Sequence, residues 1–301
     1  MIERFRPSRQ EVGRMVTGLL FVSPWIIGFL AFTIYPMGAS FYYSLTHYDV
    51  FRPARFVGLD NYREMFFIDS MFGTVLGNTL WFVVVSVPAA FVTAFLLAIL
   101  LNQKIRARPL FRTIFFLPSI TPAVASVMVW LWIYNTQHGL INSILIGFGK
   151  KAIPWLSSTT LAKPSLVIVQ CWMQGTAVVI FLAALQDVPR ALYEAALVDG
   201  ANTLQRFWNV TIPMVTPVML FVLLTGLIGT FQSFLFPWLL TRGGPNNATE
   251  LYSVYVYRSA FKHFKMGYAS ALGWLLLLII VVFTVILFRT SARWVYYGGE
   301  E

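Results

Sequence analysis

The strongest constraint on this chain is a set of six long apolar runs that contain no Asp, Glu, Lys or Arg. Each run has 21 to 27 residues, and a helix needs roughly 20 residues to cross a bilayer. None of the runs alternates apolar and polar residues as the strands of a membrane barrel do. The runs are Thr17–Tyr42, Val75–Leu101, Thr113–Thr136, Pro164–Gln186, Met214–Leu240 and Tyr268–Phe288. They predict an all-α membrane protein with six transmembrane helices.

Composition excludes the soluble alternatives. Of the 301 residues, 58% are apolar and 11% are charged, whereas soluble domains carry about 25% charged residues. Disorder requires low hydrophobicity and high charge, so it is excluded as well. In a soluble protein the net charge of +10 would suggest nucleic acid, but here we expect no nucleic-acid partner. Lys and Arg divide almost evenly between the expected cytoplasmic and outside segments, 12 against 10, so their total does not orient the chain. A single cysteine, Cys171, rules out an intrachain disulfide.

Two dense basic clusters orient the chain. Residues 1–16 and the segment NQKIRARPLFR (102–112) each hold four Lys or Arg, and short early loops weigh most in topology. We therefore expect both termini in the cytoplasm, with 1–16 as an N-terminal segment, 17–290 as the transmembrane domain and 291–301 as a C-terminal tail. The first apolar run is longer than the core of a secretory signal, so we expect it to be retained.

Several residues inside or beside the runs receive structural interpretations. Prolines within the runs should kink the helices rather than end them, either adjusting the packing or widening a central pathway. Trp130, Trp132 and Tyr134 should form an interfacial aromatic belt. The histidines should be isolated surface residues in outside loops, at His47, His138 and His263.

The missing charge in the six runs also limits the function. Ion-driven transporters generally place ionisable residues at membrane depth, and an intramembrane enzyme would need a nucleophile with a base, or metal ligands. The runs supply no histidine or carboxylate for either purpose, and the chain has no P-loop motif for nucleotide. An energy source outside this chain is therefore expected, and an intramembrane enzyme becomes the weaker alternative.

The longest expected cytoplasmic loop, 187–213, reads DVPRALYEAALVDGANTLQRFWNVTIP. Its pattern predicts two short helices. Pro189 can start the first, Gly200 breaks it, and either Asn202 or Thr203 can cap the second before Pro213 ends the loop. Taken alone, such a loop could be an ordinary amphipathic connector between two spans.

This loop resembles the EAA motif of permease subunits from binding-protein-dependent ABC importers. The family pattern is Glu-Ala-Ala, three residues, Gly, nine residues, an aliphatic residue, one residue, an aliphatic residue and Pro. Every spacing is kept, with Glu194, Ala195, Ala196, Gly200, Val210, Ile212 and Pro213 at the matching positions.

The likeness extends to other segments and points to the sugar branch of the family, the maltose and glycerol-phosphate type. FVGLDNYREMF (56–66), LFRTIFFLPSITPAVA (110–125) and LTRGGPNNATELYSVYVYRSAF (240–261) resemble its characteristic stretches. The resemblance implies the type I ABC importer permease fold with six helices. It also implies a multi-pass protein of the prokaryotic cytoplasmic (inner) membrane.

The resemblance further implies the partners and the coupling element. The chain would pair with a second homologous permease, more often a different one than a copy, with two ABC ATPase subunits and with an extracytoplasmic sugar-binding protein. ATP and Mg would be bound by the ATPase subunits, and this chain would hold no cofactor. Glu194 would pair with a basic residue in a groove of the ATPase, and Gly200 would permit the sharp turn. The implied coupling residues are Glu194, Ala195, Ala196, Asp199, Gly200, Ala201, Phe207 and Pro213.

A neutral sugar needs hydrogen-bonding and aromatic side chains but no charge, which the fourth and fifth runs can supply. The resemblance places sugar-contact positions at Gln170, Met173, Gln174, Gly226, Thr230 and Ser233. The alternative for these residues is hydrogen bonding between neighbouring helices. A phosphorylated or polyol cargo such as glycerol-3-phosphate is the alternative substrate; it would call for basic residues that the runs lack and that the partner permease could supply.

Overall fold

The computed structural model of the chain describes residues 9–103 and 106–296. The start of the expected cytoplasmic segment, two residues of the basic 102–112 cluster and the end of the C-terminal tail lie outside these ranges. The described chain is mostly helical and forms two compact units. One unit combines the N-terminal part up to Met65 with Ser259–Trp274, and the other combines Phe66–Arg258 with the chain from Leu275 onward.

The first unit contains one long apolar helix and a small polar cap. The helix runs without interruption over Gly13–Ser44, and no residue in its most apolar stretch is buried. In the cap, the buried Asn61 amide donates to the carbonyl oxygens of Ser44 (2.8 Å) and Thr46 (2.9 Å). The elements of this unit are α1 (Arg9–Phe29), the π-helical η1 (Leu30–Ile34), α2 (Tyr35–Ser44), an antiparallel pair β1 (Thr46–His47) and β2 (Arg55–Phe56), α3 (Asp60–Arg63), most of η4 (Arg258–Lys262) and the start of α15 (Met266–Ser291).

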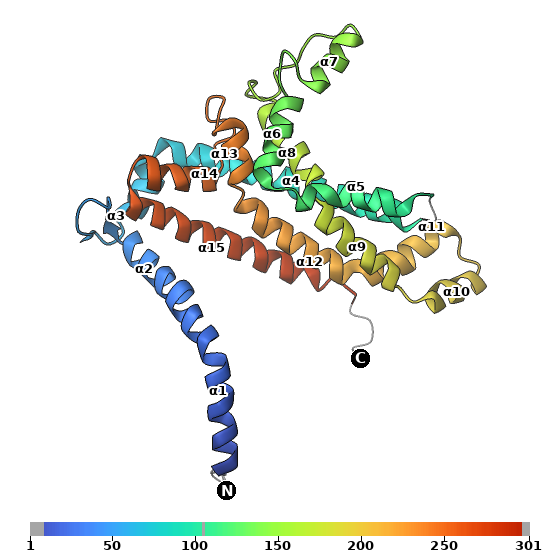
Figure 1. The fold of residues 1–301 in the computed structure, drawn as a ribbon, viewed down its shortest axis with the longest axis horizontal. Coiled ribbons are helices and arrows are strands. Elements are labelled where there is room, and N and C mark those ends of the chain that lie inside the picture. The colour runs from blue at the N-terminus through green and yellow to red at the C-terminus, as the bar shows by residue number, and fades with distance from the viewer. Residues whose placement is uncertain (1–8, 104–105, 297–301) are drawn as a thin grey trace. The chain divides into compact units, whose positions relative to one another are not determined.

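The second unit is built around α4 (Ser70–Asn102), which packs against α8, α9 and α12 (Figure 1). Small alanines on α4, Ala94 and Ala98, are fully buried against Phe181 of α9 and Val215 of α12, because small residues let membrane helices approach closely. The other elements are η2 (Glu64–Ile68, begun in the first unit), α5 (Arg108–Ile120), α6 (Ala123–Ile133), α7 (Leu140–Gly147), α8 (Ala162–Trp172), α9 (Gly175–Asp187), α10 (Arg190–Val198), α11 (Thr203–Arg206), η3 (Phe207–Thr211), α12 (Ile212–Phe231), α13 (Leu235–Thr241), α14 (Tyr252–Tyr257) and the rest of α15.

By length and composition, four helices in the described chain can cross a membrane, or up to six if two bent helix pairs each count as one span. The expectation that prolines only kink the helices is wrong for the third run, because α5 ends at Ile120, α6 begins at Ala123 and the two helices are bent by 104°. Pro122 lacks an N–H and disfavours helical backbone at Thr121, which is extended with ψ 135°. The fourth run bends by 47° between α8 and α9. The fifth ends as a helix at Phe231 and resumes in α13.

Two other prolines are accommodated by π turns. Pro36 and Pro213 each lie at the second residue of an α-helix that directly follows a π-helical turn, η1 or η3. A proline cannot donate to the carbonyl four residues before it, and the wider turn lets the neighbouring amides bond one residue further back. Both helices therefore continue through their prolines, as the sequence predicts for Pro36 in the first run.

The expected aromatic belt is mostly buried. Trp130 and Tyr134 lie in the core of the second unit, and the Tyr134 hydroxyl donates to the carbonyl of Ser165 (3.1 Å). Only Trp132 is exposed, as a belt residue should be.

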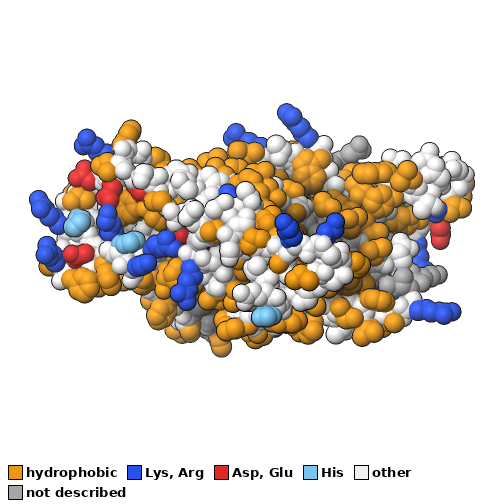
Figure 2. Space-filling view, turned by 90° about the horizontal axis from the view of Figure 1, so that it is seen from above, with side chains coloured by type: hydrophobic (Ala, Val, Ile, Leu, Met, Phe, Trp, Pro, Cys, Tyr) orange, Lys and Arg blue, Asp and Glu red, His pale blue; other side chains and the backbone are white. Residues whose placement is uncertain are grey.

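On the face shown in Figure 2, hydrophobic side chains cover much of the surface and acidic side chains are few.

The expectation that all three histidines are isolated is also wrong for two of them. His47 and His263 line one pocket of about 240 Å³ in the cap of the first unit, together with Asp49, Glu64 and Lys265. The start of α15 contacts the residue that follows β1, where the Gly267 amide donates to the Tyr48 carbonyl (3.1 Å). Lys265 forms an exposed ion pair with Glu64 (2.7 Å).

Candidate functional site

The connector between α9 and α12, residues 188–211, folds as a helix, a tight turn and a second helix. Pro189 directly precedes α10, and α10 ends at Val198. Gly200 then adopts a φ of +79°, a left-handed conformation that glycine enters without steric cost. Its amide donates to the Leu197 carbonyl and the Ala201 amide to the Ala196 carbonyl, the paired bonds of a Schellman helix end. The predicted break at Gly200 is confirmed.

Asn202, rather than Thr203, caps the second helix of the connector. Its side chain accepts from the Gln205 amide (2.9 Å), and the Gln205 side chain accepts from the Asn202 amide (2.8 Å), which forms a complete capping box. The helix then continues through α11, η3 and α12. The expectation that Pro213 ends the loop is therefore wrong: the helix begins at Thr203, and Pro213 lies inside it.

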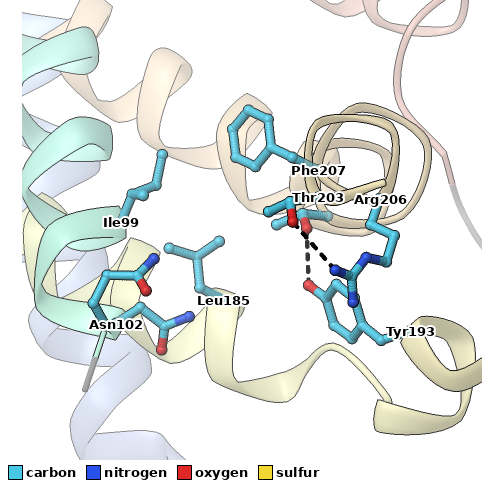
Figure 3. Close-up of a pocket in the computed structure, with 9 residues that line it drawn as sticks. Ile99, Asn102, Leu185, Tyr193, Thr203, Arg206 and Phe207 are labelled. Carbon is cyan, nitrogen blue, oxygen red and sulfur yellow. Dashed lines mark hydrogen bonds between the residues drawn. The ribbon is translucent and has the colours of Figure 1, made fainter. Parts of the chain in front are cut away.

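Tyr193 anchors α10 to the start of the long helix. Its hydroxyl shares a hydrogen bond of 2.8 Å with the Thr211 hydroxyl. Figure 3 shows Tyr193 beside Thr203 and Arg206, opposite Ile99, Asn102 and Leu185. All of these residues line a pocket of about 240 Å³, and Arg206 is bonded to the Thr203 hydroxyl (3.3 Å). The sequence gives no sign of this anchor, because the identity of the partner depends on how α10 folds back on η3.

The outer face of the connector leaves apolar side chains uncovered. No residue of α10 is buried, and Val198 is 88% exposed. Glu194 and Asp199 are exposed beside it, and neither forms a salt bridge within the described chain. The other exposed apolar residues of the connector are Leu192, Leu197, Leu204 and Trp208. Such an apolar patch with an acidic margin is typical of a surface that docks on another protein.

The residues with an expected role in cargo binding fall into two groups. Met173 and Gln174 lie in the bend between α8 and α9. The side-chain amide of Gln174 donates from Nε2 to the backbone carbonyl of Gln170 (3.0 Å). Gly226 lies within α12, Thr230 is buried near its end, and Ser233 lies in the break before α13.

Gln174 is the expected cargo residue that lines a cavity described in the second unit. Gln174 lines a space of about 350 Å³ beside Thr93, Phe115 and Trp172. The lining of this cavity does not include Gln170, Met173, Gly226, Thr230 or Ser233. The lining is mostly apolar, with Thr93 and Gln174 as its hydrogen-bonding side chains and no charged side chain, which suits a neutral ligand.

A second motif-bearing segment, Arg242–Arg258, is held by buried polar contacts. Glu250 is fully buried and pairs with Arg258 (3.0 Å). The Asn78 amide of α4 donates to the Asn247 carbonyl (2.7 Å), and the Lys163 ammonium donates to the Asn78 side chain (3.0 Å). The sequence marks this segment only by its family resemblance, because Asn78 lies 169 residues away from Asn247.

Comparison with known proteins identifies the family. Residues 86–297 match the family described as "Binding-protein-dependent transport system inner membrane component". The chain belongs to this family. It is therefore a transport subunit of a membrane-embedded system and not an enzyme.

Related proteins match over nearly the whole chain. A probable ABC transporter permease protein of Bacillus subtilis, YesP, is 40% identical over 99% of this chain and 98% of its own. The lactose transport system permease LacF of Rhizobium radiobacter is 34% identical over 94% and 97%. The arabinooligosaccharides transport system permease AraP of Bacillus subtilis is 33% identical over 93% and 89%.

A solved structure shares the fold. A chain of a bacterial ABC transporter involved in the import of the acidic polysaccharide alginate superposes with a TM-score of 0.83, covering 94% of this chain and 98% of that one at 24% identity. The expectation of a type I ABC importer permease fold agrees with this match.

Proposed function

We propose that this chain forms half of the transmembrane pathway of an ATP-driven importer for a sugar or oligosaccharide. The cargo would be delivered by an extracytoplasmic binding protein, and a second, different permease would complete the pathway. The exposed connector between α9 and α12 carries the coupling part of this proposal, since its apolar patch with Glu194 and Asp199 is folded and uncovered.

The connector would dock into a groove of one of two ATPase subunits, which bind ATP and Mg, while this chain binds neither. Closure of the ATPase pair would push on α10, and the Tyr193–Thr211 bond would pass the movement into η3 and α12. This coupling element would consist of Glu194, Ala195, Ala196, Asp199, Gly200, Ala201, Phe207 and Pro213. An ion pair of Glu194 that is desolvated at such a joint would be costly to break.

The proposed topology has six spans with both termini in the cytoplasm of a prokaryote. Each bent pair, α5 with α6 and α8 with α9, would then be one span. This arrangement places the connector and the basic 102–112 cluster on the same, cytoplasmic side as the ATPase subunits.

A neutral cargo is supported by the uncharged cavity at Gln174 and by the absence of charge from the six runs. The relatives named for lactose and arabinooligosaccharides point the same way. Gln170, Met173, Gln174, Gly226, Thr230 and Ser233 remain the proposed pathway residues. The cavity favours Gln174 most.

A phosphorylated or polyol cargo such as glycerol-3-phosphate is the second candidate. A relative in Agrobacterium fabrum, 29% identical, is named for transport of sulfoquinovosyl glycerol, so the family extends beyond neutral sugars. The cations for such a cargo would have to come from the partner permease.

Purification of the assembly with its co-expressed binding protein tests the proposal. Calorimetry should show that the binding protein takes up a neutral sugar, and that the loaded protein stimulates ATP hydrolysis by the assembly. Gln174→Leu should raise the sugar KM for uptake about tenfold, as expected for about 1.4 kcal/mol of lost hydrogen bonding; Gln137→Leu, at an exposed site outside the cavity, is the control. Binding of phosphorylated compounds alone would reject the neutral cargo, and an assembly without ATPase would reject the importer.

A further inference from the structure

An apolar groove of about 270 Å³ runs between α5 and α9 of the second unit. Its inner side is formed by buried residues, among them Val178 and Leu182 of α9. Its rim is formed by exposed apolar side chains, namely Phe116, Leu117, Ile120 and Val179. The groove is separate from the connector, and neither the coupling element nor the proposed cargo cavity accounts for its exposed rim.

One end of the groove is strongly basic. Arg112 lines this end, and Arg108 lies one turn earlier on α5. With the Gln186 amide oriented by its hydrogen bonds, its oxygen accepts from the Nη2 atoms of both arginines at 2.8 Å. Arg108 also donates from Nε to the Leu101 carbonyl (2.6 Å).

The two arginines carry charge that the described chain does not neutralise. The salt bridges found within the described ranges join Arg258 to Glu250 and Lys265 to Glu64, and neither includes Arg108 or Arg112. The Nε of Arg112 is buried and has no hydrogen-bond partner there. A single neutral oxygen thus holds two guanidinium groups close together, an arrangement that is completed by an anion.

We propose that this groove binds an anionic phospholipid, with its phosphate on Arg108 and Arg112 and an acyl chain along the rim residues. From Arg112 to Ile120 the helix rises about 12 Å, so the apolar part extends well away from the cations. A water-soluble anion would not cover Phe116, Leu117 and Ile120, and a neutral lipid would leave the arginines without a counter-charge. Basic residues at the border of a membrane span attract anionic headgroups. In the proposed topology the lipid belongs to the cytoplasmic leaflet.

The position of the groove gives the lipid a structural consequence. Gly175 allows α9 to approach α5 closely, because a Cβ at this residue would lie 2.7 Å from the Phe115 carbonyl oxygen. The groove opens beside this contact, so a bound acyl chain packs against both helices where they meet. An occupied groove should therefore stabilise the packing of α5 against α9. Helix α9 is followed directly by α10 of the connector.

Native mass spectrometry of the complete assembly tests the headgroup contact. Assemblies in detergent are titrated with phosphatidylglycerol or with phosphatidylcholine of the same chains. The wild type should retain phosphatidylglycerol, and the Arg108→Gln/Arg112→Gln variant should bind it at least tenfold more weakly. Arg289→Gln, at an exposed residue in the last turn of α15, should bind like the wild type. Equal loss in both variants, or no loss in either, overturns the proposal.

A second pair of variants tests the apolar part without touching the arginines. Val179→Trp should fill the groove and release the lipid, whereas Leu278→Trp on the exposed face of α15 should not. Only variants that elute as intact assemblies are compared, so that misfolding is not counted as lipid loss. If the intact Val179→Trp assembly binds the lipid as the wild type does, the lipid proposal is wrong. If Val179→Trp instead separates the two permease subunits while Leu278→Trp does not, the groove is a subunit interface and the lipid proposal is also wrong. The outcome does not depend on which cargo is carried.

Discussion

The connector between α9 and α12 and the segment Arg242–Arg258 both carry family motifs, but their residues are held in different ways. In the segment, Glu250 is fully buried against Arg258, and Asn247 is bonded to Asn78 of α4. In the connector, apart from the Tyr193–Thr211 anchor, the polar bonds run between residues at most five apart. The segment is thus completed by its own chain, whereas the connector has a fixed shape and an uncovered face that calls for a partner.

The largest expected effect comes from breaking the buried pair of the segment. Glu250→Ala leaves Arg258 without its counter-charge and should lower the free energy of unfolding by ~3–5 kcal/mol. Thermal unfolding of the purified assembly measures this loss. Glu64→Ala, in the exposed pair with Lys265, is the matched control and should cost ~0–1 kcal/mol. Equal losses of unfolding free energy in the two variants would show that the buried pair stabilises the protein no more than the exposed pair does.

Two glycines with positive φ extend the comparison. Gly243 has a φ of +84°, and an added Cβ would collide with the Glu250 carboxylate. Gly200 has a φ of +79° with open space around the same position. Gly200→Ala should therefore cost only the conformational strain, about 1 kcal/mol, while Gly243→Ala should cost roughly 2–4 kcal/mol because backbone strain and displacement of the buried pair add. A smaller loss of unfolding free energy for Gly243→Ala than for Gly200→Ala would contradict this account.

The smallest effect is expected at the connector cap. Asn202→Ala removes the bond to the Gln205 amide and should destabilise the start of α11 by about 1 kcal/mol. Hydrogen exchange at the amides of residues 203–206 should speed up about fivefold. Asn202→Asp keeps the cap and serves as the control; faster exchange in both variants would argue against a capping role.

Local signals in the sequence were sufficient for the connector. Pro189, Gly200 and Asn202 act on neighbouring residues, and each does in the structure what its chemistry predicts. Four of the six apolar runs likewise overlap single helices long enough to cross a membrane, and the third and fourth runs are bent helix pairs. By contrast, the 104° break at Pro122 was expected only as a kink, since the sequence alone does not show whether neighbouring groups satisfy the freed carbonyls.

Contacts between distant residues could not be predicted in the same way. The presence of His47 and His263 in one pocket and the bond between Asn78 and Asn247 both depend on how distant segments of the chain pack. Trp130 and Tyr134 were assigned to the membrane border because aromatic residues are enriched there, but packing buries them. A single sequence contains the residues of such contacts without identifying their partners.

The central claim is that the connector transmits force through a surface made for a partner, and Glu194 tests it most directly. Glu194 is exposed and forms no salt bridge within the described chain. Glu194→Lys should therefore change the unfolding free energy by less than about 0.5 kcal/mol. We propose to measure ATP hydrolysis and sugar uptake together in proteoliposomes that contain the complete assembly and loaded binding protein. The account predicts that Glu194→Lys reduces both at least tenfold while the two permeases remain folded and paired. Wild-type hydrolysis and uptake in that variant would contradict it.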